Sequence, residues 1–279
     1  MKTLVRILIV AAVLLLIGAM AAFYTIYNSD SLQQDVLEEK TFNEPIDEME
    51  ITVENSRIEF LPSNDDTARI VVVGNDDNFA LKTDVSGGRL VIEVEDTNWF
   101  FLFDFNQSYS LQVYVPANGL ASLSADSDDG RIQANDIGAT ELSFQADNGR
   151  ISLEAVESEM VDVETDNGRI ELTNMAADMT LHSSNGRIIF TDVSGELQAK
   201  TNNGRIELNA ETLDFPVDLE TDNGRIEIYT QNEPENARIE AHVDNGSTDV
   251  FGRDSRDVSF GSGDVLIRLD SDNGSIFVE

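Results

Sequence analysis

The sequence predicts an all-β protein, a parallel β-solenoid (β-helix) of about 18–20-residue coils, preceded by one N-terminal transmembrane helix. Three observations support this prediction. Nearly the same octapeptide recurs, as TDNGRIEL at Thr165–Leu172, TNNGRIEL at Thr201–Leu208 and TDNGRIEI at Thr221–Ile228. From Met49 onward apolar and polar residues alternate, which is typical of strands. A single long apolar run lies at the N-terminus.

This apolar run extends from Leu4 to Tyr27, and its only charged residue is Arg6. It is long enough to cross a bilayer as a helix. Lys2 and Arg6 lie at its start and acidic residues follow it, so the positive-inside rule places the N-terminus in the cytoplasm. We therefore expect residues 1–27 to be a single-pass signal anchor in the cell membrane, with the C-terminal domain outside the cell.

A cleaved signal peptide is the alternative, because Ala19, Met20 and Ala21 fit a small-residue cleavage site. The anchor is favoured because apolar residues continue beyond this site, through Phe23 and Ile26. In either case the protein is exported.

The composition excludes several functions. The chain has 279 residues, no cysteine and a formal net charge of −35. Without cysteine there is no disulfide, thiolate metal site or cysteine nucleophile. The strongly negative charge argues against nucleic-acid binding, which requires a basic surface, and predicts a diffuse attraction of cations.

We expect four segments. Residues 1–27 are the anchor, and residues 28–45 are an acidic stalk without a sustained period. Residues 46–118 form an N-terminal β region with an aromatic insertion. Residues 119–279 form the solenoid of NGRI repeats.

The glycine of the repeat recurs every 18 to 20 residues, which indicates stacked units that cannot bury their apolar faces alone. The regular copies are at Gly130, Gly149, Gly168, Gly186, Gly204 and Gly224, with looser copies at Gly246 and Gly274. Glu54–Phe60 (ENSRIEF) and Ser86–Ile92 (SGGRLVI) resemble worn versions of the same unit.

Two all-β architectures could use this repeat. Asn-Gly between alternating segments is a strong hairpin signal. A two-residue hairpin loop would, however, place Glu164 opposite Glu171, and like charges opposed across strands are destabilising. In a parallel solenoid each residue stacks instead on its counterpart about 4.8 Å away. The solenoid is therefore expected.

Matched apolar positions then form three inward ladders. These are Ile151, Ile170, Ile188, Ile206 and Ile226; Leu153, Leu172, Phe190, Leu208 and Ile228; and Phe144, Val163, Leu181, Ala199 and Leu219. At the corner we expect amide side chains to bond from coil to coil, followed by glycines whose backbone conformation a side chain would forbid. This turn ladder comprises Asn148, Gly149, Asn167, Gly168, Asn185, Gly186, Asn203, Gly204, Asn223 and Gly224.

An anchor, an acidic stalk, a VYVP strand around Tyr114 and serial NGRI coils ending in DNGSIFV together resemble the bacterial putative-adhesin family. In particular the chain is similar to the membrane-anchored LiaG-type proteins of Gram-positive bacteria. The resemblance covers residues 49–279. It implies a β-solenoid ectodomain associated with envelope stress or surface adhesion, and it carries over no catalytic or binding residue.

A row of arginines follows the glycines and could bind an anionic polymer. It comprises Arg131, Arg150, Arg169, Arg187, Arg205 and Arg225. We expect instead that nearby acids neutralise the row, because an unpaired like-charge contact at about 4 Å costs about 1 kcal/mol in water. Those acids are Asp147, Asp166, Asp222, Glu171, Glu207 and Glu227.

No specific metal site or cofactor is expected. Asp126–Ile132 (DSDDGRI) and Asp270–Ile276 (DSDNGSI) are similar to the start of a calcium loop, but their glycine comes one residue too early.

The chain is not expected to be an enzyme. His182 and His242 are its only histidines, both at polar strand positions, and no G-x-S-x-G elbow is present. The predicted function is a non-catalytic surface scaffold, adhesin-like or envelope-stress-associated, whose partner is an envelope protein or a cell-wall polymer. The alternative is a polysaccharide-active β-helix enzyme of the envelope.

The aromatic insertion is NWFFLFDFNQSY, residues 98–109. One hypothesis is a plug that closes the N-terminal end of the solenoid. The other is an exposed surface that contacts membrane or a partner. The candidate contact residues are Trp99, Phe100, Phe101, Leu102, Phe103 and Phe105.

Overall fold

The computed structural model describes residues 35–75, 78–97 and 109–279. Residues from Val36 to Glu279 form one compact unit. Within the described ranges, no helix is long and apolar enough to cross a membrane. The expected anchor, residues 1–27, lies outside those ranges.

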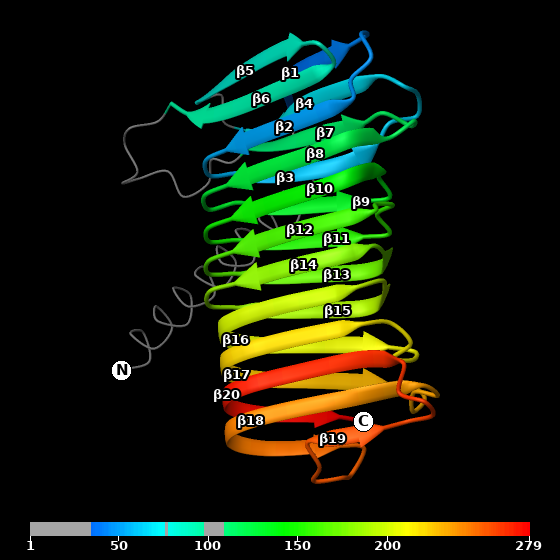
Figure 1. Cartoon of the computed structure of the whole chain (residues 1–279). Helices are drawn as coiled ribbons and strands as arrows, with labels where there is room; N and C mark the ends of the chain where they lie inside the picture. Colours follow the sequence, from blue (N-terminus) through cyan, green and yellow to red (C-terminus); the bar gives the residue numbers. More distant parts are fainter. Residues whose placement is uncertain (1–34, 76–77, 98–108) are drawn as a thin grey trace, which may run out of the picture. The chain divides into compact units, whose positions relative to one another are not determined.

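The described residues form a 20-stranded, mostly parallel sheet (Figure 1). Its strands are β1 (Asp35–Phe42), β2 (Glu48–Val53), β3 (Arg57–Pro62), β4 (Ala68–Gly74), β5 (Phe79–Ser86), β6 (Arg89–Asp96), β7 (Tyr109–Val115), β8 (Leu120–Ser127), β9 (Arg131–Asn135), β10 (Ala139–Ala146), β11 (Arg150–Glu154), β12 (Met160–Thr165), β13 (Arg169–Ala176), β14 (Asp178–Ser183), β15 (Arg187–Ser194), β16 (Leu197–Ala210), β17 (Val217–Thr230), β18 (Ala237–Val250), β19 (Asp257–Ser259) and β20 (Val265–Val278).

The repeats pair in parallel and in register, which is consistent with the predicted solenoid. Ile170 pairs with Ile151 on one side and with Ile188 on the other. The antiparallel hairpin alternative is wrong. In the parallel register Glu164 lies between Gln145 and His182, so the Glu–Glu contact of a hairpin does not arise.

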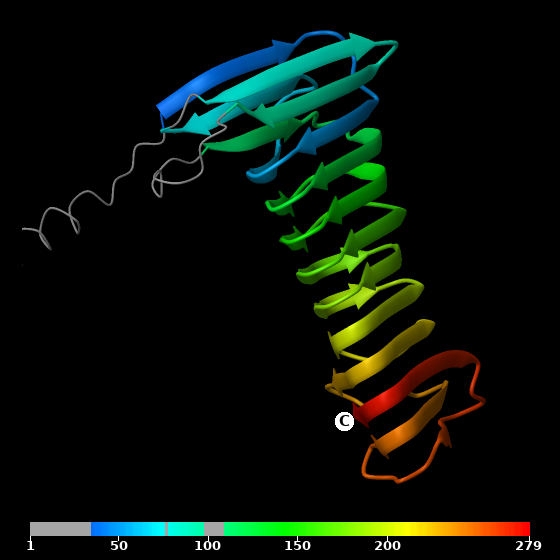
Figure 2. The same cartoon turned by 90° about the vertical axis from the view of Figure 1, so that its left-hand side faces the viewer.

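Each coil consists of two strand segments joined at the Asn–Gly corner. The first segments form one row from β8 to β14, and the second segments form another from β9 to β15. In β16, β17, β18 and β20 the two segments merge into single strands of 14 residues that pass through the corner. Figure 2 shows these coils stacked above one another, with the two rows facing each other across the core.

The three predicted inward ladders are confirmed as the core between the two rows. Members of each ladder pair with their counterparts, and their side chains are buried. The alternation of apolar and polar residues places one face of every strand in this core and the other in solvent.

The order of the coils in space differs from their order in the sequence at both ends. The first coil, β2 with β3, lies between the β6–β7 coil and the β8–β9 coil. The last strand, β20, lies between β17 and β18. The first coil and the last strand therefore each have a neighbour on both sides.

Antiparallel strands cover the two ends of the stack. At the N-terminal end β4 pairs with β7 and β5 pairs with β6, while β19 pairs with β18 at the other end. Ile70 and Val72 of β4 belong to the core, and Phe79 and Leu81 of β5 pack against it. Strands β4 and β5 therefore supply apolar cover to the β6–β7 coil, which lies at this end of the stack.

Two expected segment boundaries differ from the structure. Strand β1 lies inside the predicted stalk of residues 28–45 and pairs with β4, so residues 36–42 belong to the folded unit. Residues 46–118 and 119–279 are not separate units, because β2 and β3 stack directly on β8 and β9 across that boundary.

One predicted copy of the repeat is wrong. Ser86–Ile92 is the turn of the antiparallel β5–β6 hairpin, in which Ser86 pairs with Arg89. Gly87 and Gly88 have φ of 63° and 87°, as a two-residue hairpin turn requires. The other worn copy, Glu54–Phe60, does form the corner of the first coil.

Candidate binding surface

The asparagine ladder at the corner is confirmed, and it extends beyond the predicted residues. Each amide donates from Nδ2 to the Oδ1 of the coil before it in the stack, over 2.9 to 3.2 Å. In stack order the ladder comprises Asp129, Asn148, Asn167, Asn185, Asn203, Asn223, Asn273 and Asn245. Asp129 ends the ladder, because an ionised carboxylate accepts but cannot donate.

The corner glycines are required for close approach and not for a left-handed backbone. The corner glycines from Gly149 to Gly224 are absent from the positive-φ residues. A Cβ on Gly204 would lie 1.7 Å from the carbonyl oxygen of Gly186, and a Cβ on Gly224 would lie 1.6 Å from that of Gly204. Only glycine lets consecutive corners approach this closely.

The arginine row is only partly neutralised. Glu171 pairs with Arg150 and Arg169 at 3.8 and 3.1 Å, and Glu227 pairs with Arg205 and Arg225 at 3.2 and 2.9 Å. Two other acids that were expected to pair with the arginines accept hydrogen bonds from other side chains. Asp166 accepts from Ser184, and Glu207 accepts from Asn209.

Arg131 and Arg187 form no ion pair with a carboxylate of the described residues, so the prediction of a fully neutralised row is wrong. The residue two positions further along each strand differs from coil to coil. Glu171 has Ile189 as its counterpart in the next coil, so the coil that carries Arg187 lacks the glutamate. Gln133 takes this position in the coil of Arg131.

A groove runs along the glycines beside this row. It has a volume of about 670 Å³ and is lined by Gly186, Arg187, Gly204, Arg205, Gly224, Arg225, Gly274 and Ser275. Its lining contains arginine side chains and no acid. The sequence alone does not predict this groove, because the groove depends on the stacking of the corner glycines, which leaves bare backbone beside the arginines.

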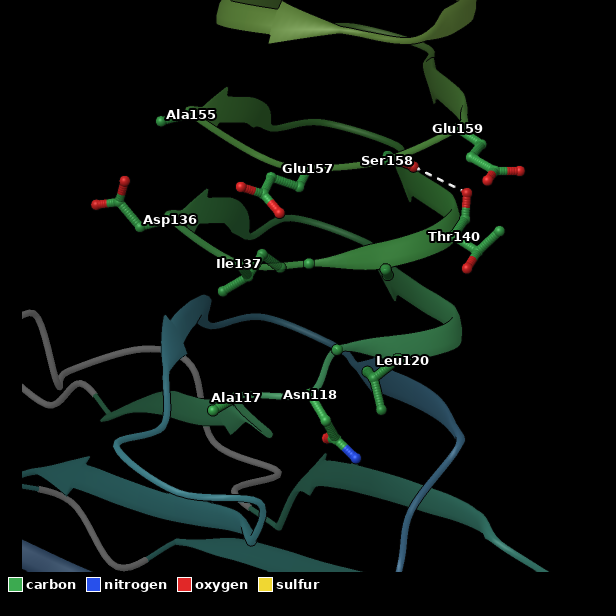
Figure 3. Close-up of a pocket in the computed structure, with 13 residues that line it drawn as sticks. Ala117, Asn118, Leu120, Asp136, Ile137, Thr140, Ala155, Glu157, Ser158 and Glu159 are labelled. Carbon is green, nitrogen blue, oxygen red and sulfur yellow. Dashed lines mark hydrogen bonds between the residues drawn. The ribbon is translucent and has the colours of Figure 1, made fainter.

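A second groove lies at another corner, between the turn before β8 and the two coils that follow (Figure 3). Its volume is about 590 Å³. Asp136, Glu157 and Glu159 line it and are exposed. Ser158 donates from its hydroxyl to the carbonyl oxygen of Thr140, a bond that joins neighbouring coils across the groove.

Both histidines lie on the outer face, in one row. His182 is placed between Glu164 and Lys200. His242 pairs with Asp270 in register, and its Nε2 lies 3.0 Å from Asp244. Burial raises the pKa of Asp270, and the nearby Glu220, Asp272 and Asp244 act in the same direction, whereas His242 opposes them.

The calcium-loop-like segments are corners of the stack. Asp129 and Asn273, one from each segment, are members of the amide ladder. Burial, followed by repulsion from Asp128 and Asp147, raises the pKa of Asp126. Among the residues that the structure describes, no group of three or more His, Asp or Glu side chains could hold a metal ion.

The candidate contact residues Trp99, Phe100, Phe101, Leu102, Phe103 and Phe105 lie outside the described residues. The strands on either side are β6 and β7, which form one coil. Its contact with a membrane or a partner stays a prediction.

The fold and this surface define a class: a repeat protein that holds its core between two rows of strands and presents in-register polar ladders outside. The chain belongs to the Toastrack DUF4097 family, which matches residues 46–279. This match confirms the predicted relation to the putative-adhesin family. No curated protein matches the chain.

Among solved structures, the chain is similar to a putative adhesin from Bacteroides fragilis NCTC 9343, with a TM-score of 0.53 and 13% identity over 87% of this chain and 96% of that chain. This likeness shows the fold. A putative lipid binding protein from Parabacteroides distasonis ATCC 8503 matches with a TM-score of 0.41 and 12% identity over 87% of this chain and 96% of that one. A putative adhesin from the same strain matches with a TM-score of 0.40 and 10% identity over 88% and 98%.

Proposed function

We propose that the protein is a non-catalytic, membrane-anchored binding module of the bacterial surface, with an adhesin-like or envelope-stress-associated role. The observation that carries this proposal is the regularity of the outer face. Its side chains stand in rows repeated from coil to coil, such as the asparagine ladder. Rows of this kind suit contact with an extended partner, as in other stacked-repeat proteins.

The grooves support binding more than catalysis. A polysaccharide-active enzyme would use a pair of acids, one with a raised pKa, on either side of the scissile bond. In the groove of Figure 3 the acids Asp136, Glu157 and Glu159 are exposed to solvent. The groove beside the arginines has no acid in its lining.

The proposed location rests on the sequence. The apolar run from Leu4 to Tyr27, with Lys2 and Arg6 at its start, supports a single-pass anchor with the folded unit outside the cell. The partner is an envelope protein or a cell-wall polymer, reached from the membrane surface.

One experiment tests location and binding together. In fractionated cells that express the full chain, the protein should remain with the membranes, and external protease should release the folded unit. The released unit should then be retained by envelope fractions. A product in the medium that begins near Ala22 would contradict the anchor. A released unit that no envelope fraction retains would contradict the binding role.

A further inference from the structure

The groove along the corner glycines is a cationic strip on a strongly acidic protein. Its floor is backbone, because the residues at the corner are glycines, and the side chains of Arg187, Arg205 and Arg225 lie beside that floor. The chain as a whole carries a net charge of −35. The lining of this groove is therefore positively charged, whereas the protein as a whole is negatively charged.

Arg187 is the member of this strip that forms no ion pair with a carboxylate in the described part of the chain, whereas Arg205 and Arg225 do. The outward position that holds glutamate in the coils on either side, Glu171 and Glu207, is Ile189 in its own coil. Isoleucine cannot pair with a guanidinium group. Of the two flanking glutamates, Glu171 pairs with Arg150 and Arg169, and Glu207 accepts a hydrogen bond from Asn209, so the charge of Arg187 is available to a ligand.

Arg205 and Arg225 are held in place by an ion pair, but not all of their N–H donors are used. Both pair with the single carboxylate of Glu227, which is only 6% exposed. A guanidinium group has five N–H donors, so each arginine keeps donors beyond those that face Glu227. The shared carboxylate orients the two side chains without cancelling both charges.

The three charges lie in a line. Arg187 pairs in register with Arg205, which pairs with Arg225, so consecutive residues are one strand apart, about 4.8 Å. A ligand that matches them carries negative groups at intervals along a chain. A broad anionic surface such as a bilayer would also meet the acidic remainder of the protein, which would repel it.

We infer that this groove binds a linear, single-chain polyanion that carries phosphate or carboxylate groups, with Arg187 as its principal contact. This inference rests on the proposed function as a surface binding module, and it names the class of partner. Guanidinium groups bind both kinds of anion through paired N–H donors.

The decisive variant restores the missing glutamate. Ile189→Glu places a carboxylate beside Arg187 and should weaken binding at least tenfold, and Arg187→Gln should do the same. Ser152→Glu is the matched control, because it adds the same charge to the same outward row two coils from Ile189. It should leave the affinity within about twofold. All three positions face outward, so melting temperatures should stay close to that of the parent.

The binding assay uses the full chain in detergent and fluorescently labelled polyphosphate, with polyglutamate as the carboxylate arm and phosphatidylglycerol vesicles as the membrane arm. We expect binding to one or both polymers at low salt. A plot of the logarithm of the binding constant against the logarithm of the salt concentration should have a slope of about −2, from three contacts at roughly 0.7 each. In Arg187→Gln the slope should be shallower by about 0.7.

Three outcomes would overturn the inference: no polymer binding at low salt, equal losses in Ile189→Glu and Ser152→Glu, or binding to vesicles alone. The proposed function fails separately. If envelope fractions retain the Ile189→Glu protein as well as the parent, the binding role stands and only the groove assignment is wrong.

Discussion

The side chains of Asn185 and Asn203 are joined by a hydrogen bond of 3.0 Å, although the residues lie 18 positions apart in the sequence. The bond runs along the stack, from one coil to the next. The same contact recurs at every coil from Asn148 to Asn223, so the corner is a continuous chain of amides.

Interrupting this chain of amides should lower stability by a modest amount. Asn203 donates to Asn185 and accepts from Asn223, so Asn203→Ala removes both contacts. We expect a loss of about 1 kcal/mol in the free energy of unfolding, because the groups left behind can still reach water. Urea denaturation of the parent and the variant measures this loss, and an unchanged midpoint would show that the ladder contributes nothing.

The corner glycines should tolerate substitution far less than a glycine that only needs a left-handed backbone. Gly204→Ala would place a Cβ 1.7 Å from the carbonyl oxygen of Gly186, so the coils must separate. We expect a loss of more than about 3 kcal/mol. Gly87→Ala is the control, because φ there is 63° and the added Cβ would have no neighbouring atom within 4 Å. It should cost only about 1 kcal/mol, and similar losses at both sites would refute the close-approach explanation.

A stabilising change is expected at the opposite corner. Ala155 has φ of 52°, and the residues at this corner in three other coils, Asp136, Asn174 and Asp192, have φ between 52° and 54°. Asparagine and aspartate adopt this conformation more readily than alanine does. Ala155→Asn should therefore raise the free energy of unfolding by about 0.5–1 kcal/mol, measured by thermal and urea denaturation. A decrease would mean that packing at the groove outweighs the backbone preference.

The raised pKa of Asp270 predicts a pH-dependent effect. Burial and the nearby acids disfavour its charged form in the folded protein. A carboxyl whose folded pKa is raised favours folding below its unfolded pKa, about 3.9, and loses this contribution as the pH rises through the folded value. Asp270→Asn should therefore raise the melting temperature at pH 7. The difference from the parent should shrink as the pH falls through the raised folded pKa, and it should be nearly gone below about 4. An increase that is the same at both pH values would contradict the assignment to Asp270.

Much of the fold follows from the sequence, because matched positions of a repeat must occupy matched environments. The phase of Ile170 and its counterparts identified the buried ladders and the outward arginines. The two stack ends did not follow, because their strands depart from the repeat. Ser86–Ile92 contains the glycine and arginine of a coil but forms a hairpin. The position of β20 between β17 and β18 depends on contacts between segments distant in sequence.

The candidate surface could be predicted in part. The arginine row is visible in the sequence, and so is Ile189 in place of a glutamate. Which acid reaches which arginine was not predictable, because Asp166 and Glu171 lie at similar distances along the chain from Arg169. In the structure Arg169 forms its ion pair with Glu171, which lies on the same face of the same strand. Asp166 instead accepts a hydrogen bond from Ser184 of the next coil.

The account rests on parallel stacking in register, and electron paramagnetic resonance tests this most directly. The chain has no cysteine, so nitroxide labels can be placed at Thr173→Cys and Thr191→Cys, which pair in register and face outward. Their separation of about one strand spacing, 4.8 Å, predicts strong dipolar broadening of the spectrum. Labels at Glu164→Cys and Glu171→Cys, which an antiparallel hairpin would place opposite each other, should show much less. Broadening in the second pair and not in the first would contradict the parallel stack.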